Sequence, residues 1–250
     1  MQGKNSSRST RVRSTKPYIT KPIRTFTDAL AAAEPRPLPT GTQAEKKNYA
    51  ERFSRALATL IANLLRPTFP GIIPDETGKR QEQPAATSKG YKKLDVGYRT
   101  LELGLGFGVS VKTLNFRDPE TKRYTKNYTR VDNELRAEAM DYHKRQPFTV
   151  LVAVIFIPLD ASDDAGKSSM SSFAQAINVF RGRTGRDSYK GEAEEFERIF
   201  IALYDVAPAS LALFDVGRDP PRAGRPGPAD LISLEEFADE VTTTFRQRNP

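Results

Sequence analysis

The sequence predicts an α/β protein in which helices flank a mixed central β-sheet. Residues 149–157 (TVLVAVIFI) are apolar and rich in β-branched side chains, which is typical of a central strand that is covered on both faces. Residues 210–216 (SLALFDV) predict a second buried strand. Segments with apolar residues at spacings of three and four alternate with these strands, which predicts helices packed on the sheet. We expect a single domain over residues 41–250, preceded by a basic arm and linker over residues 1–40.

The N-terminal arm is the most basic part of a chain whose net charge is +8. Residues 1–27 contain seven Lys or Arg residues and no Asp or Glu, so the rest of the 250-residue chain is close to neutral. Few apolar residues and many Ser and Thr residues predict that the arm is disordered. Two readings are equally supported: the arm holds a polyanion through phosphate contacts, or it is a solvated tail without a fixed partner.

Composition excludes several kinds of active site. The chain contains no Cys, and His143 is its only histidine, so neither a thiolate site nor a His-rich zinc site or catalytic triad is expected. Any metal site must then use oxygen ligands, which suits Mg²⁺, Mn²⁺ or Ca²⁺. No signal peptide is visible, and no apolar run approaches the ~20 residues of a membrane helix. We therefore expect a cytoplasmic protein.

The first half of the domain predicts a helix followed by a pair of strands. Apolar residues recur at spacings of three and four over residues 44–65, and Pro67 stops this helix. After a polar, irregular stretch, residues 93–116 (KLDVGYRTLELGLGFGVSVKTLNF) predict two β-strands. Glycines at 104, 106 and 108 indicate a tight or bulged turn between the strands.

The second half is predicted to alternate helices with the two buried strands. Helices are expected over residues 132–144, 171–180 and 192–204, and from Ser233 onward. The last helix is marked by a capping box, because Glu236 follows Ser233 by three residues. This order places helices on both faces of the sheet.

Two charged residues interrupt the apolar strands of residues 93–116. Asp95 has Leu94 and Val96 as neighbours, and Lys112 lies in a similarly apolar stretch. A charge inside an apolar strand is costly to bury without a partner. Because the strands are joined by a short turn, an aspartate and a lysine so placed could hold a divalent cation and a phosphate side by side. The alternative is a structural cross-strand ion pair, which contributes only about 0–1 kcal/mol when exposed.

With these residues the chain resembles the PD-(D/E)xK nuclease superfamily, which includes many restriction endonucleases. That family has an acid on one strand of a hairpin and (D/E)xK on the next, in the order helix, antiparallel strands, helix, strand, which is similar to residues 44–157. Asp95 matches the first acid, and Lys112 matches the lysine within Ser110-Val111-Lys112. Ser110 stands where the family usually has Asp or Glu, and the proline that usually precedes the first acid is missing.

Some members of the family with SxK take the missing carboxylate from the following helix. In this chain Glu134 is the first choice for that role and Glu138 the second, and their spacing of four puts them on one helix face. Glu102, at the approach to the turn, is a further candidate metal ligand. The alternatives are a solvated helix face for Glu134 and Glu138, and a turn-flanking role for Glu102.

The resemblance implies a metal-assisted hydrolysis. Asp95 and the migrated carboxylate would bind Mg²⁺ or Mn²⁺, and a metal-bound water would attack the scissile phosphate. Lys112 would orient that water or stabilise the charge that develops on the phosphorus centre.

Basic residues lie beside tyrosines after the strand pair. Residues 117–130 contain Lys122, Arg123, Lys126 and Arg130, a mixture that suits phosphate contact with base stacking. Two further residues are grouped with them as expected nucleic-acid contacts: Arg183, in a second basic loop, and Ser110, beside Lys112. Exposed loops without a ligand are the alternative for both basic segments.

Taken with the resemblance, the sequence predicts a Mg²⁺-dependent endonuclease that hydrolyses phosphodiester bonds of DNA, of restriction or defence type. The expected fold is restriction-endonuclease-like, and the expected partner is double-stranded DNA. The sequence does not by itself decide between DNA and RNA as the substrate. A homodimer is implied only by the resemblance, because many restriction enzymes act as dimers. The alternatives are a non-catalytic nucleic-acid-binding protein with a decayed site, and an assembly protein whose arm holds a polyanion.

Overall fold

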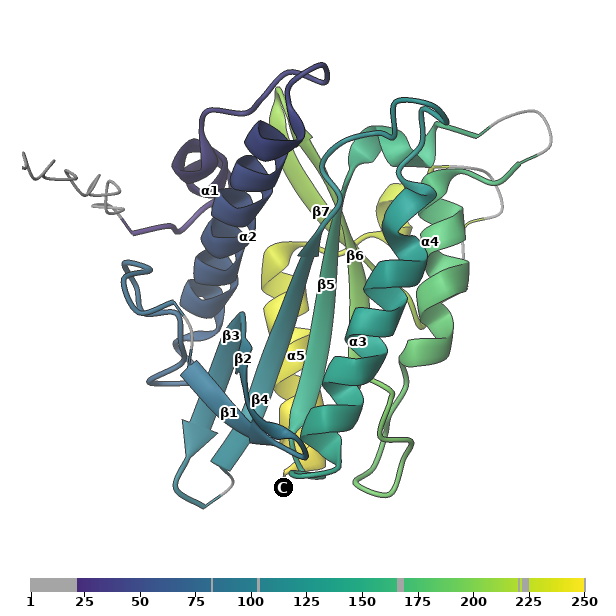
Figure 1. Cartoon of the computed structure of the whole chain (residues 1–250). Coiled ribbons are helices and arrows are strands. Elements are labelled where there is room, and N and C mark those ends of the chain that lie inside the picture. Colours follow the sequence, from purple (N-terminus) through teal and green to yellow (C-terminus); the bar gives the residue numbers. More distant parts are fainter. Residues whose placement is uncertain are drawn as a thin grey trace, which may run out of the picture.

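A five-stranded mixed sheet forms the centre of the computed structural model, which describes residues 22–81, 83–102, 104–165, 169–219, 221 and 225–249 (Figure 1). The strands lie in the order β3 (Val96–Thr100), β4 (Gly104–Thr113), β5 (Val150–Pro158), β6 (Arg198–Val206) and β7 (Ala209–Asp215). β4, β5 and β6 run parallel, whereas β3 and β7 are antiparallel to their neighbours. The predicted α/β class with a mixed sheet is confirmed.

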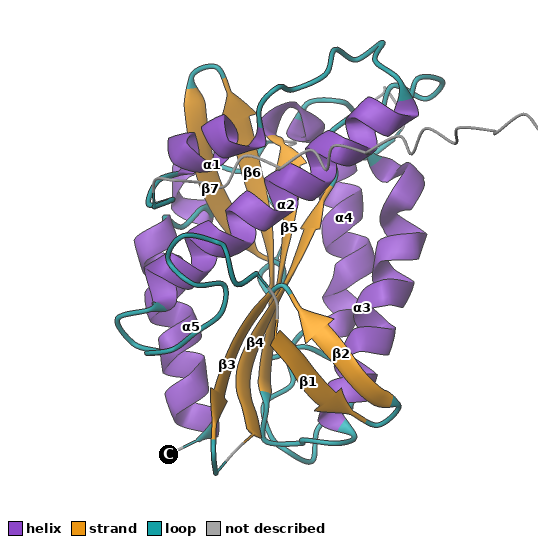
Figure 2. Ribbon diagram, turned by 60° about the vertical axis from the view of Figure 1, so that its left-hand side comes forward, coloured by secondary structure: helices purple, strands orange, loops and turns teal. Residues whose placement is uncertain are grey.

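Helices cover both faces of the sheet (Figure 2). One face packs against α1 (Phe26–Ala33), α2 (Gln43–Leu65) and α5 (Leu234–Arg248), and the other against α3 (Tyr128–His143) and α4 (Ser172–Phe180). β5 is buried along its whole length because its side chains alternate between the two apolar cores. This alternation is the physical reason why its sequence is apolar without interruption.

A separate hairpin, β1 (Gln83–Thr87) and β2 (Gly90–Leu94), lies beside the C-terminal part of α3 (Figure 1). The backbone N–H of Ser88 donates to the carbonyl of Asp141 at 2.9 Å, and Lys92 forms an ion pair with the Asp141 carboxylate. Asp95 is the single residue between β2 and β3, so it lies at a bend and not inside a strand as predicted.

Four short 3₁₀ turns complete the described structure: Thr125–Asn127, Leu159–Ser162, Arg181–Arg183 and Pro228–Asp230. The predicted helices over 44–65, 132–144 and 171–180 are confirmed, although α3 begins four residues earlier, at Tyr128. The predicted capping box at the start of α5 is also confirmed. Within the described residues, no helix is long and apolar enough to span a bilayer.

The helix predicted over residues 192–204 is wrong, because β6 occupies most of that segment. Its apolar residues do recur at spacings of three and four. In the structure, however, Ile199 faces one core and Phe200 the other, and both are fully buried. A short apolar run of this kind fits a buried strand as well as a helix, and periodicity cannot separate the two.

Residues 22–40, which the sequence assigns to the arm and linker, contain an ordered helix. α1 begins with a capping box between Thr25 and Asp28, and it buries Phe26 against Phe53 and Tyr204. The helix has only eight residues and several alanines, so its periodic signal is weak. Residues 1–21 lie outside the described residues, and the prediction of a disordered arm remains a prediction for them.

Candidate active site and basic groove

Asp95 and Lys112 lie close together on the face of the sheet that α3 covers. The carboxylate of Asp95 accepts a hydrogen bond from the backbone N–H of Val111 at 2.8 Å, which holds it beside the segment Ser110 to Lys112. Val111 faces the opposite core, so Ser110 and Lys112 project toward α3. Side-chain alternation along β4 therefore positions Ser110 and Lys112, and the hydrogen bond from Val111 positions Asp95.

Two carboxylates from α3 complete a cluster around Lys112. Its Nζ lies 3.5 Å from Glu138 Oε2 and 3.7 Å from Glu134 Oε2. Ser110 Oγ donates a hydrogen bond to Glu138 Oε2 at 3.1 Å, so the serine fixes the second of these acids. We call Asp95, Ser110, Lys112, Glu134 and Glu138 the carboxylate–lysine cluster.

The cluster keeps Lys112 in its charged form. Burial alone would lower the pKa of the Lys112 ammonium, but the carboxylates of Glu138, Asp95 and Glu134 together raise this pKa above its ordinary value. The Lys112 side chain is only 20% exposed, so this ammonium is a largely desolvated cation among acids.

Two buried polar atoms near the cluster have no hydrogen-bond partner among the described residues: the Tyr142 hydroxyl and Arg99 Nε. Tyr142 is fully buried and lies one helical turn after Glu138. Burial raises the pKa of the Tyr142 hydroxyl, and the charges that act on it include those of Glu138, Arg99 and Asp95. An unpaired buried hydroxyl costs about 1–3 kcal/mol. Because this hydroxyl lies next to the cluster, we count Tyr142 as a site residue, and sequence reasoning missed it. The spacing of four from Glu138 was the signal available.

The carboxylates of the cluster are suitable ligands for a hard divalent cation, but they do not converge on a single position where a metal ion could bind. Carboxylate oxygens are the ligands that Mg²⁺ and Mn²⁺ prefer. Among the residues that the structure describes, however, no three Asp, Glu or His side chains come close enough together to hold a metal ion. Between Glu134 and Glu138 lies the Lys112 ammonium.

Glu102 does not belong to the cluster, so the structure does not bring it to the other predicted metal ligands. It is exposed in the turn between β3 and β4, at the opposite end of β4 from Lys112. In a hairpin the turn and the open ends lie a full strand length apart. Nearness in the sequence therefore misleads at this position.

A basic groove of about 430 Å³ adjoins the cluster at the C-terminal end of β4. Six cations contribute to its lining: Lys46, Lys47, Arg117, Arg123, Lys126 and Arg130. Asp118 is the one acid among the lining residues. Arg130 joins the groove to the cluster, because its Nη1 lies 2.5 Å from Glu134 Oε1.

The predicted nucleic-acid contacts divide into two groups. Arg123, Lys126 and Arg130 line the groove, whereas Lys122, Arg183 and Ser110 do not. Ser110 is fully buried and bonded to Glu138, so it is not available to a nucleic acid. Lys122 is exposed in the preceding turn. Arg183 is held against α3, because its guanidinium group donates to both carboxylate oxygens of Asp132 at 2.8 and 3.2 Å. The prediction of Arg183 as a nucleic-acid contact is therefore replaced by a structural role.

Lys46 and Lys47 are groove residues that sequence reasoning missed. They belong to the first turns of α2, whose apolar pattern drew attention to its buried face. No ion pair joins either lysine to an acid among the described residues, whereas Lys126 is paired with Asp118 at 2.6 Å. The two lysines are therefore the groove cations most available to an anionic ligand.

The tyrosines of residues 117–130 do not provide a surface for base stacking. Tyr124 and Tyr128 are both buried, and their hydroxyls donate to Asp160 and to the carbonyl of Ser172 at 2.8 and 2.9 Å. The expected base stacking is therefore wrong for this segment. Its side chains offer phosphate contacts alone.

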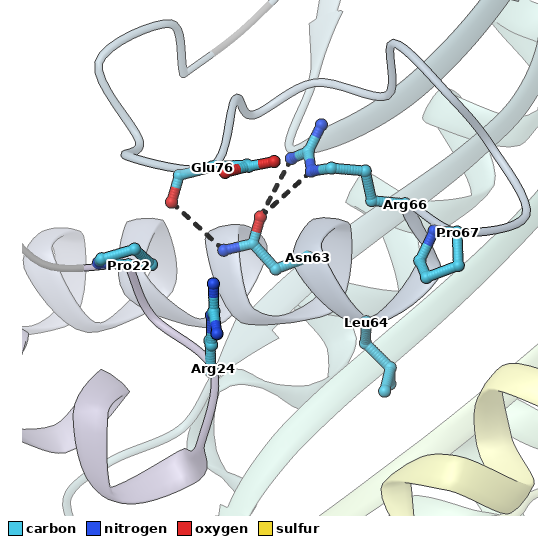
Figure 3. A pocket seen from close by; sticks show the side chains of 7 residues that line it. All are labelled: Pro22, Arg24, Asn63, Leu64, Arg66, Pro67 and Glu76. Carbon is cyan, nitrogen blue, oxygen red and sulfur yellow. Dashed lines mark hydrogen bonds between the residues drawn. The ribbon is translucent and has the colours of Figure 1, made fainter.

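A second pocket, of about 530 Å³, lies on α2 away from the cluster (Figure 3). Asn63 is its central polar residue. Its amide donates to the carbonyls of Ile23 and Glu76, and its oxygen accepts from Arg66. These bonds fasten the chain before α1 and the loop at Glu76 to α2, which accounts for the polar groups of Asn63 and Arg66 without a ligand.

No family model, curated protein or solved structure matches this chain. The geometry of the cluster and the groove is therefore the basis for assigning a function.

Proposed function

We propose that this protein is a metal-dependent endonuclease of restriction type that hydrolyses phosphodiester bonds of DNA. The observation that carries the proposal is the convergence of Asp95, Glu134 and Glu138 on Lys112, beside a groove lined by cations. The order α2, antiparallel β3 and β4, α3, and β5 supports a restriction-endonuclease-like fold, because it matches the order of elements in the PD-(D/E)xK superfamily.

Each residue of the cluster has a distinct role in this mechanism. Asp95, Glu138 and Glu134 would hold a divalent cation, which supplies an activated water and polarises the phosphate when it is bound. Lys112 donates hydrogen bonds toward the charge that develops on the phosphate oxygens. Ser110 does not replace the usual acid as a ligand; it positions Glu138 through their hydrogen bond.

The groove supports a double-stranded substrate. Its cations can neutralise backbone phosphates, which fix the register of a duplex without reading its sequence. Proteins that bind single strands without sequence preference rely on exposed aromatic side chains, and Tyr124 and Tyr128 are buried. Phe116 also lines the groove, but it is only partly exposed and packs against Tyr49. Phosphate contacts therefore predominate, which favours a duplex as the ligand.

Cleavage of plasmid DNA in Mg²⁺ or Mn²⁺ tests the proposal directly. We expect Lys112→Ala and Asp95→Ala each to abolish cleavage while the circular dichroism spectrum stays that of the wild type, because each removes a group that acts on the phosphate or its metal ion. Glu102→Ala is the matched control: it removes an acid from the same hairpin, outside the cluster, and should leave cleavage unchanged. Full activity in either cluster variant would refute the assignment.

A nucleic-acid-binding protein with a decayed site is the second candidate. Ser110, in the position where the related nucleases usually have an acid, favours it, as does the open arrangement of the described carboxylates. This candidate predicts duplex binding that persists in EDTA, with no cleavage of DNA or RNA in either metal.

A further inference from the structure

Lys112 takes the place between Glu134 and Glu138 that a metal ion would be expected to take. Its ammonium lies within 4 Å of both side chains, and the Asp95 carboxylate also acts on it. Carboxylates that share a desolvated site repel one another unless a cation lies among them. The Lys112 ammonium supplies that cation for Asp95 and Glu138, and it shares Glu134 with the Arg130 guanidinium.

We propose that Lys112 is a resident cation that a divalent metal ion displaces. The inference rests on the proposed nuclease function, and it adds a step to it: metal uptake releases the ammonium from Glu134 and Glu138, and the freed ammonium turns toward the substrate phosphate. An ammonium and a divalent ion cannot share the same carboxylates without strong mutual repulsion, so the two exchange.

The two glutamates hold Lys112 only loosely. Charge-assisted hydrogen bonds are usually about 2.7–2.9 Å long, whereas Lys112 Nζ lies 3.5 Å from Glu138 Oε2 and 3.7 Å from Glu134 Oε2. A lysine has a flexible four-carbon stem and can turn its ammonium without any movement of the backbone. Glu138 stays positioned during such a turn, because Ser110 also holds it.

A second observation points to the same rearrangement. The Tyr142 hydroxyl is fully buried near Glu138 and Asp95, yet it has no hydrogen-bond partner among the described residues. Buried hydroxyls in proteins are almost always paired. A divalent ion held by these carboxylates keeps several water ligands, and one of them can pair with this hydroxyl while Glu138 stays in place.

Calorimetric titration of the full chain with Mn²⁺ tests the exchange. We expect Lys112→Met, which removes the competing charge at similar size, to bind Mn²⁺ about tenfold or more tightly than the wild type, the equivalent of roughly 1.4 kcal/mol. Lys112→Arg keeps the charge and should bind no more tightly than the wild type. Lys144→Met carries the same change in net charge at an exposed position outside the cluster and the groove, and it should not alter the affinity.

Equal or weaker Mn²⁺ binding by Lys112→Met would overturn the proposal, as would a gain of the same size in Lys112→Arg or Lys144→Met. Thermal unfolding gives a second measurement. In EDTA we expect Lys112→Met and Lys112→Gln to have lower melting temperatures than the wild type. Addition of Mn²⁺ should raise the melting temperatures of both variants by more than it raises that of the wild type. If neither variant folds even in Mn²⁺, the metal ion does not substitute for the ammonium, and the proposal fails.

These results separate the exchange from the nuclease function itself. A wild-type protein that binds no Mn²⁺ and cleaves nothing would remove the proposed function. A wild-type protein that binds Mn²⁺ and cleaves DNA, together with a Lys112→Met variant of unchanged affinity, would remove the exchange alone.

Discussion

Glu197 shows how much a single buried residue supports in this chain. Its side chain is completely buried, and it accepts hydrogen bonds from the backbone N–H of Leu151 at 2.7 Å and from Arg248 at 3.1 and 3.3 Å. The Arg186 guanidinium lies 3.5 Å away, and the buried His143 ring is at the same distance. One carboxylate therefore compensates two arginines and links α5 to the sheet.

Glu197→Gln should lower the free energy of unfolding by about 3–5 kcal/mol, because it leaves two buried guanidinium groups without a counter-charge. Urea unfolding followed by circular dichroism measures the change. Glu192→Gln, an exposed acid in the preceding loop, is the control and should stay within about 0.5 kcal/mol of the wild type. A loss of less than about 1 kcal/mol in Glu197→Gln would contradict this account.

Single residues differ in how far the sequence reveals them. Asp95 and Lys112 are visible because a charge between apolar neighbours in the sequence needs a partner, although Asp95 lies at a bend between two strands. Glu138 is visible only through a comparison with nuclease patterns. Lys46 carries no local signal, because a lysine on the polar side of a helix is ordinary. Tyr142 has only its spacing of four from Glu138, because a tyrosine on a core helix is ordinary too. Their roles arise from contacts between elements that lie far apart in the sequence.

At the scale of elements, the hairpin β1–β2 depends on its attachment to α3. The carboxylate of Asp141 is almost completely buried and pairs with Lys92 and Lys89. Burial opposes its ionisation, but the two lysines lower the pKa of Asp141 below its ordinary value. The pair holds the hairpin that leads directly into Asp95.

Asp141→Asn should therefore destabilise the protein in a pH-dependent way. Because the pKa of Asp141 is lower in the folded protein than in the unfolded chain, its contribution is complete above the unfolded pKa, near 4, and is lost as the pH falls through the folded value. We expect a loss of about 1–3 kcal/mol at pH 7 that shrinks progressively below pH 4. Urea unfolding at pH 7 and pH 3 measures it, and an equal loss at both values would disprove the assignment.

Elements were predictable where pattern and length agreed. α2 has 23 residues with a clear stripe and a capping box, and β5 is apolar throughout, so both were predicted from the sequence. β6 was misassigned because a buried strand that packs on both faces has no period of two. α1 was missed because eight residues rich in alanine carry too little periodic information.

At the scale of the whole molecule, the groove and the cluster form one continuous polar region at the N-terminal end of α3. Lys46 and Lys47 come from α2, which packs on one face of the sheet, and Glu134 comes from α3 on the other. The fold therefore assembles this region from both helical layers across the end of β4. Sequence patterns within one element cannot show such an assembly.

A Lys46→Ala/Lys47→Ala double variant should bind duplex DNA more weakly at all sequences. Removing one lysine that neutralises a phosphate reduces the slope of log affinity against log salt by about 0.9, so we expect a decrease of roughly 2 in its magnitude. Fluorescence anisotropy over a range of NaCl concentrations measures it. Lys144→Ala/Lys190→Ala removes two exposed lysines outside the groove and should leave the slope unchanged. Equal slopes for the wild type and the groove variant would show that duplex DNA binds elsewhere.

The side chains of β4 alternate between the two faces of the sheet, and this alternation restricts insertions and deletions within the strand. Val111 belongs to one core while its neighbours Ser110 and Lys112 face α3, so deleting one residue within the strand would exchange the two sets. An aliphatic side chain would then face the acids, and an ammonium would enter the layer beneath α2. We therefore expect the fold to tolerate insertions or deletions in the turn before β4 but not between Phe107 and Lys112.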